Sequence, residues 1–146
     1  MSAAIVDICE AVVLTLNGRT FAMPFVAERT YRTVLDLGTL KDLQVLVVPM
    51  GQEIGVSSRK ADQFNCGVNV VVQQKLTTQA PEEIDALMDL VQEIIDCLRD
   101  SRLEGMPGVV PVSIENEPVF HDKHLVEEHV FTSVIIPTYR AWRERV

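Results

Sequence analysis

The stretch QFNCGVNVVVQ, residues 63–73, carries the clearest period-two pattern in the chain. Apolar side chains occupy alternate positions, and most of the positions between them are polar, as in a strand with one face on a core and the other toward water. The apolar set is Phe64, Cys66, Val68, Val70 and Val72, and the polar set is Gln63, Asn65, Asn69 and Gln73. Residues 63–73 are therefore predicted to be a strand.

The residues before this strand predict its partner. Ile54, Val56 and Ser58 alternate with residues of the other face, and the polar residues 59–62 suit a turn. We therefore expect a long antiparallel hairpin with its tip near Lys60. Residues 43–48 are apolar on both faces, which predicts the centre of the sheet, and residues 28–37, rich in Thr, Tyr and Val, predict a further strand.

Two segments carry helical spacing. Residues 3–16 place apolar side chains on one face, and Asn17-Gly18 follows as a stop signal. A second helix is expected to begin at Pro81, with acidic residues in its first turn. Its predicted buried stripe is Ile84, Leu87, Met88, Val91, Ile95 and Leu98, and its acidic outer face is expected to be solvated.

The last third of the chain predicts two strands, at residues 109–114 and 130–139, with a helical turn within residues 121–128. Pro137 cannot donate to a ladder, so it predicts a sheet edge or a bulge. The expected fold is a single α+β domain over residues 1–146: a mostly antiparallel sheet of about six strands with two main helices packed against it.

Composition narrows the function classes. The chain has 146 residues, 47% of them hydrophobic and 23% charged, which is typical of one globular domain. A net charge of -8 argues against a protein that grips nucleic acid. The apolar residues 3–16 are interrupted by acids and lack a basic leader, so neither a signal peptide nor a membrane span is expected. Three widely spaced cysteines predict buried free thiols.

The sequence contains one candidate metal site, formed by His121, His124 and His129 with Glu127 and Glu128. Its spacing matches no metal signature, so a polar surface loop is the favoured interpretation. No nucleophile elbow and no glycine-rich phosphate loop occurs in the sequence. We therefore expect no enzyme activity, no cofactor and no metal.

Candidate interface residues remain. They lie at the hairpin tip and in a C-terminal segment that mixes aromatic residues with arginines, the types enriched at interface hot spots. They are Arg59, Lys60, Asp62, Tyr139, Arg140 and Trp142. The alternative is that Trp142 caps the core and the arginines only keep the chain soluble.

Four stretches resemble a family of small bacteriophage proteins encoded among head–tail joining and tail genes. They are AERTYRTVLDLGTLKDLQVLVVP (27–49), EIGVSSRKADQFNCGVNVVVQQKL (53–76), EIDALMDLVQEI (83–94) and NEPVFHDKHLVEEHVFTSVIIPTYR (116–140). The nearest functional match in size and element order is the tail-terminator, or tail-completion, protein.

The resemblance implies a sheet flanked by helices, assembling as a ring, usually a hexamer. Such a ring caps the tail tube and joins it to the head connector in the virion, after assembly in the host cytoplasm, while DNA passes through without specific binding. It supplies no catalytic residues. Alternatives are a stopper, another head–tail connector or a minor tail component, a small metal-dependent enzyme using the three histidines, and a monomeric host-directed binding module.

Overall fold

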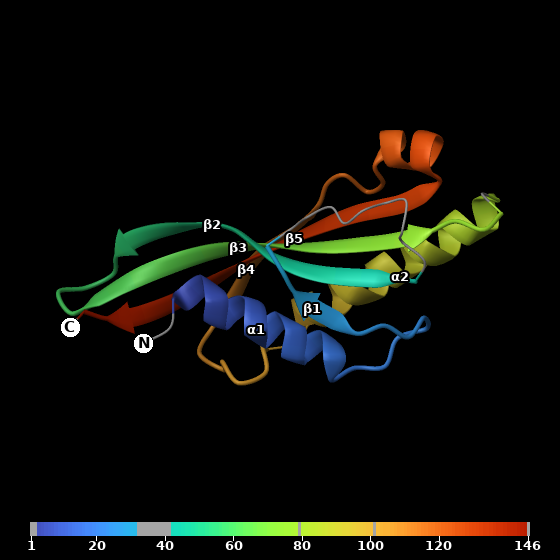
Figure 1. The fold of residues 1–146 in the computed structure, drawn as a ribbon. Coiled ribbons are helices and arrows are strands. Elements are labelled where there is room, and N and C mark those ends of the chain that lie inside the picture. The colour runs from blue at the N-terminus through green and yellow to red at the C-terminus, as the bar shows by residue number, and fades with distance from the viewer. Residues whose placement is uncertain (1–2, 32–41, 79, 101, 146) are drawn as a thin grey trace.

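A five-stranded mixed sheet with two helices on one face makes up the fold (Figure 1). The computed structural model describes residues 3–31, 42–78, 80–100 and 102–145. In chain order the elements are α1 (Ala4–Asn17), β1 (Ala27–Arg29), β2 (Gln44–Val56), β3 (Ala61–Lys75), α2 (Pro81–Asp100), β4 (Val110–Asn116), η1 (His124–Glu128) and β5 (Val130–Glu144). The strand order is β1-β2-β3-β5-β4.

The predicted long hairpin is confirmed. β2 pairs antiparallel with β3 from Gln44 opposite Gln73 to Val56 opposite Asp62, which puts the tip at residues 57–60. The separately predicted segments 43–48 and 53–58 are one strand, because a shift in register between Pro49 and Gly51 absorbs the proline without ending the pairing.

The sheet differs from the predicted one in two respects. Within the described residues it has five strands in place of about six, and β1 runs parallel to β2, so the sheet is mixed. Of the strand predicted over residues 28–37, only its start belongs to the three-residue β1, and residues 32–41 lie outside the described residues. Pairing between β1 and β2 depends on contacts distant in sequence, which period-two patterns do not reveal.

Pro137 lies in an interior strand, so the predicted sheet edge is wrong. β5 pairs with β3 on one side and with β4 on the other. The pairing of β3 with β5 passes from Gly67–Thr138 directly to Val70–Ile135, and Pro137 falls in that interval. A local interruption of one ladder therefore accommodates the missing donor.

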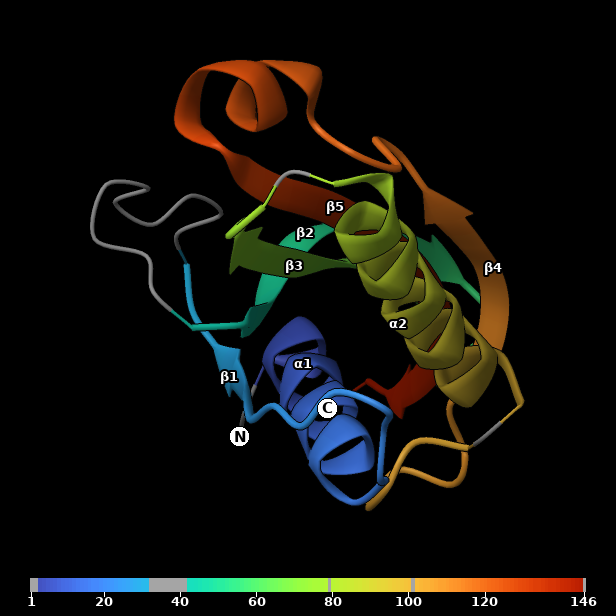
Figure 2. The same ribbon diagram turned by 90° about the vertical axis from the view of Figure 1, so that its right-hand side faces the viewer.

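One main core lies between the helices and the sheet. The stripe predicted for α1 is buried at Ile8, Cys9, Val12 and Leu16. The stripe predicted for α2 is confirmed in part: Leu87, Val91 and Leu98 are buried, and Ile84, Met88 and Ile95 are half-buried against the same core. The buried face also includes Leu90, Ile94 and Cys97, which were not predicted. The reason is that α2 packs against α1 as well as against β4 and β5, which widens the buried face (Figure 2).

The helical turn expected within residues 121–128 is present as the single turn η1, which packs on β5. Within the described residues, neither main helix has the length and apolar character needed to cross a membrane.

The far halves of β2, β3 and β5 form a twisted arm that runs beside the N-terminal half of α1, and the hairpin tip and the C-terminal end of β5 project past the helices (Figure 1). We call this arm, residues 49–67 and 138–145, the distal ribbon. It is where the predicted interface residues gather.

Candidate functional site

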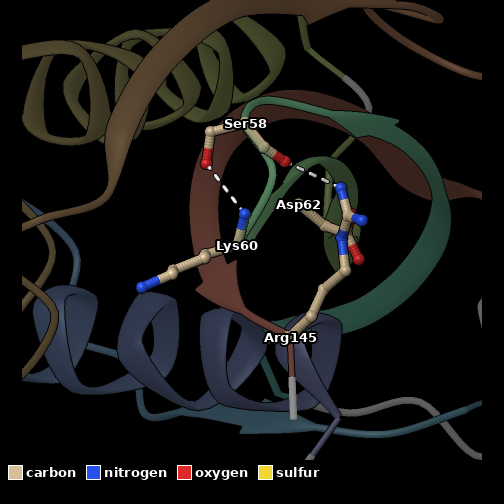
Figure 3. Close-up of polar contacts among 4 residues, drawn as sticks. All are labelled: Ser58, Lys60, Asp62 and Arg145. Atoms are coloured by element: carbon tan, nitrogen blue, oxygen red, sulfur yellow. Dashed lines mark hydrogen bonds and ion pairs between the residues drawn. The ribbon is translucent and has the colours of Figure 1, made fainter.

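The tip of the distal ribbon is held by Arg145 (Figure 3). The guanidinium of Arg145 forms an ion pair with Asp62 at 2.8 Å and donates to the carbonyl of Ser58 at 2.8 Å. Its backbone N–H donates to the carbonyl of Lys60 at 2.6 Å, and the N–H of Lys60 donates to the Ser58 hydroxyl at 3.3 Å. Two strand ends and the turn are thereby tied together.

Arg59 and Lys60 are exposed on this tied turn, as predicted for its apex. Figure 3 shows the Lys60 side chain pointing away from Arg145. Because the turn is fixed by neighbouring contacts, these two cations are presented to solvent from an ordered backbone, which lowers the entropy lost on binding.

A second ion pair fixes the ribbon to the body. Arg143 of β5 donates to the carboxylate of Asp7 on α1 at 2.9 Å. Both side chains are about one-third exposed, so the pair contributes little to stability. It nevertheless defines which face of β5 looks toward α1, and by alternation it places Arg140 and Trp142 on the face without helices.

The helix-free face of the ribbon carries Trp142, which is 45% exposed and lies opposite Gln63 on β3. Arg140 donates from its Nε to the side-chain oxygen of Asn65 at 2.9 Å and pairs across the sheet with the half-exposed Val110 of β4. Trp142 therefore does not cap the core beneath the helices. Trp142 shares this face of β5 with Arg140, whose guanidinium is oriented by Asn65, and Trp and Arg are residue types enriched at interface hot spots.

Two apolar side chains project from the edge strand of the ribbon. Ile54 is 54% exposed and Val56 is 76% exposed, and both lie on the face that looks toward the helices. Large apolar side chains exposed on an edge strand mark interaction sites or aggregation-prone edges.

Tyr139 is not an interface residue in this structure. It is 1% exposed and belongs to the main core, facing α2. Burial raises the pKa of its phenol well above the ordinary value, with Cys97 adding to the effect. Its hydroxyl has no hydrogen-bond partner within the described residues. We therefore remove it from the candidate set.

The three histidines do not converge. The rings of His121 and His124 stack with centroids 3.9 Å apart, and the Nδ1 of His124 lies 3.0 Å from the Thr132 hydroxyl. Burial, and then the neighbouring His121, lower the pKa of His124. His129 ends the turn η1 with a left-handed backbone and is exposed. Within the described residues, no three side chains of His, Cys, Asp or Glu are grouped to hold a metal ion.

Cys9, Cys66 and Cys97 are buried free thiols, as predicted. Burial raises the pKa of all three, that of Cys9 to about 11, with Arg29 partly opposing the rise at Cys9. A thiol with a raised pKa carries little thiolate at neutral pH, so these residues are poor nucleophiles.

The hollows on the surface are shallow. One of about 310 Å³ lies on the helix-free face of the ribbon, between Met50, Glu53, Asn65 and Thr138. Another of about 360 Å³ lies beside α1, between Asp7, Glu10 and Met106. Neither of these two hollows is lined by a cysteine or histidine, and both are open to solvent, unlike the enclosed apolar pockets that hold small molecules.

The outer face of α2 is acidic and exposed, as the sequence predicts. Exposed carboxylates lie at Glu82, Asp85, Asp89, Asp96 and Asp100. Glu83 differs from them because it turns back to the preceding loop and accepts hydrogen bonds from the backbone and hydroxyl groups of Thr77 and Thr78, at 2.7 to 3.1 Å. Glu83 therefore anchors the loop that leads into α2.

Sequence reasoning missed Arg145, Arg143 and the exposure of Ile54 and Val56. The predicted last strand stopped at Tyr139, whereas β5 continues to Glu144. Charged side chains at Arg140 and Arg143 hide the alternation there, although Ala141 keeps the buried parity. The available signal was the hairpin itself, since the part of a three-stranded arm beyond the helices exposes both faces.

No family model matches this chain, and no curated protein is similar to it in sequence. The resemblance to phage proteins therefore stays a prediction.

Proposed function

We propose that this chain is a structural subunit that assembles with copies of itself through the distal ribbon, and that the assembly is a ring of the tail-terminator kind in a bacteriophage virion. The observation that supports self-assembly is the ribbon itself. Its tip projects past the helices and is tied by Arg145, and it exposes Ile54, Val56 and Trp142 (Figure 1).

The ribbon exposes apolar surface that a neighbour could cover. Burying Ile54, Val56 and Trp142 against a neighbour would contribute on the order of 1 kcal/mol or more per side chain to the free energy of association. The same residues contribute little to the stability of an isolated chain because about half or more of each is already in water. An arm of this kind is better explained by a contact outside the chain than by one within it.

The phage context comes from the sequence resemblance, and the net charge of the chain is compatible with it. The proposed partners are other copies of the chain in a ring of six, together with a tail tube protein and a head connector. The net charge of -8 suits a ring through which DNA slides without being held.

Substitutions of the exposed apolar residues of the distal ribbon test the self-assembly proposal. The double substitution Ile54→Ser/Val56→Ser is expected to leave the unfolding free energy within about 1 kcal/mol of the natural chain, because both residues are exposed. It is expected to weaken self-association at least tenfold, measured by sedimentation equilibrium. Trp142→Ala is expected to act in the same direction.

A matched control uses an exposed valine away from the ribbon. Val126, in η1, is 65% exposed, so Val126→Ser removes similar apolar surface from a different place. Association that weakened equally in Val126→Ser would assign the effect to general hydrophobicity, and unchanged association in the ribbon variants would reject the ribbon as the contact.

Electron microscopy of particles that lack the protein separates the tail-terminator role from its closest alternatives. Overlong tails are expected for a terminator, whereas heads that leak DNA would indicate a stopper. Elemental analysis of the purified chain tests the metal-dependent enzyme, because a stoichiometric metal would replace the structural proposal.

A further inference from the structure

The charges of this acidic chain are separated between its two ends. Residues 57–62 and 140–145, at the ribbon tip, contain five Arg or Lys and two Asp or Glu, a net of +3 in a chain of net -8. Residues 81–100, which form α2, contain seven acids and one arginine, a net of -6. Figure 1 places the tip and the first turns of α2 at opposite ends of the molecule.

The basic end of the molecule is a turn whose backbone is fixed by several contacts. Arg145 ties the two strand ends to the turn through its contacts with Asp62, Ser58 and Lys60 (Figure 3). The N–H groups of Ser57 and Ser58 also donate to the carbonyl of Ala61, both at 3.1 Å. Arg59 and Lys60 therefore stand on an ordered turn, and docking them requires no folding of the loop.

The acidic end supplies the complementary charge. Exposed carboxylates of α2 recur at residues 82, 85, 89, 96 and 100, which is the three-to-four spacing of one helix face. Like charges at this spacing destabilise a helix by about 0.2–0.5 kcal/mol per pair. A cationic partner laid along the face would relieve that repulsion.

We propose that the ribbon tip of one copy docks on the outer face of α2 of the next copy, with Arg59 and Lys60 against Asp85 and Asp89. This inference rests on the proposed self-assembly and adds its direction. Two different surfaces at opposite ends make a head-to-tail contact, the type that closes a ring. Asp62 and Glu144 beside the tip disfavour a phosphate backbone as the occupant, so a second copy is the better match.

A charge-swap experiment tests the docking. Arg59→Glu/Lys60→Glu is expected to weaken self-association at least tenfold, and so is Asp85→Lys/Asp89→Lys. Both pairs of substitutions combined in one chain are expected to restore association to within about threefold of the natural chain, because the charge complementarity returns with its signs exchanged. Association of the natural chain is also expected to weaken as salt shortens the Debye length from about 10 Å at 0.1 M to about 3 Å at 1 M.

Matched controls reverse exposed charges elsewhere. Arg102→Glu/Lys123→Glu and Glu115→Lys/Glu127→Lys change the net charge by the same amounts and are expected to leave association unchanged; all four residues are exposed. Circular dichroism confirms that each variant is folded.

The outcomes separate the two proposals. A natural chain that is monomeric at every concentration rejects self-assembly and the docking together. A natural chain that assembles while the tip reversal assembles equally well rejects the docking alone. Failure of the combined variant to recover, or loss of binding to a short DNA duplex in the tip reversal, assigns the tip to another partner and overturns the inference.

Discussion

Tyr139 and Trp142 lie close together on β5 and meet opposite environments. Tyr139 is on the helix side, buried with Ala141, and Trp142 is half-exposed on the helix-free side, the face that also carries Arg140. The difference follows from strand alternation, since residues an odd number of positions apart point to opposite faces. Only the outer of the two aromatic residues can contact a partner without rearrangement of the core.

Tyr139→Phe tests this assignment. The buried hydroxyl has no partner within the described residues, and an unsatisfied buried polar group costs about 1–3 kcal/mol. The substitution is therefore expected to leave the unfolding free energy unchanged or to raise it by about 1 kcal/mol, with self-association unaffected, as measured by urea unfolding and sedimentation. A loss above about 1 kcal/mol would show that the hydroxyl is satisfied after all.

At this scale five of the six predicted interface residues stay predictions, and the sixth, Tyr139, is buried. Arg59, Lys60 and Trp142 are exposed, as an interface requires, and Asp62 and Arg140 are oriented by partners that no local pattern reveals. Tyr139 was misplaced because the predicted strand ended there. Extending the alternation to Glu144 would have assigned it to the core face.

The elements with strong periodicity were predictable and their boundaries were not. The β2–β3 hairpin and α1 follow from spacing alone, because each buries one regular face. The wider buried face of α2 depends on contacts with α1, and the short parallel β1 depends on pairing with β2. Such long-range contacts leave no mark in a single segment, so the number and direction of strands could not be predicted.

Glu83, in the first turn of α2, has a pKa that is lowered on folding. Burial alone would raise the pKa of Glu83, but the hydrogen bonds from Thr77 and Thr78 outweigh it and lower the pKa below 4.5. A carboxylate whose pKa is lowered on folding stabilises the folded state above its unfolded pKa, and that contribution is lost as the pH falls through the folded value.

Glu83→Ala is therefore expected to cost about 1 kcal/mol of unfolding free energy at neutral pH, the net contribution of a typical hydrogen bond. The difference from the natural chain should shrink as the pH is lowered below about 4.5, the ordinary glutamate range. Glu82→Ala is the control, since Glu82 lies in the same turn and is exposed. Equal losses in both variants at neutral pH would contradict the role of Glu83 in anchoring the loop before α2.

For the whole molecule, the proposed function depends on the overall shape of the chain and not on any single side chain. A helix-covered body and a hairpin tip that projects past the helices give the chain two chemically different ends, one acidic and one basic (Figure 1). Neither the arm nor its relation to α2 could be predicted from the sequence, because both depend on where the helices stop covering the sheet. The account of function depends on that asymmetry.

The most direct measurement of the central claim is the native mass of the purified chain across a wide range of concentrations. The expected result is a single closed oligomer whose mass is a whole-number multiple of the 16.3 kDa chain, most simply a hexamer. The oligomer is expected to dissociate when Ile54 and Val56 of the distal ribbon are replaced by serine. A natural chain that stays monomeric throughout, or whose oligomer is indifferent to those substitutions, would contradict the account.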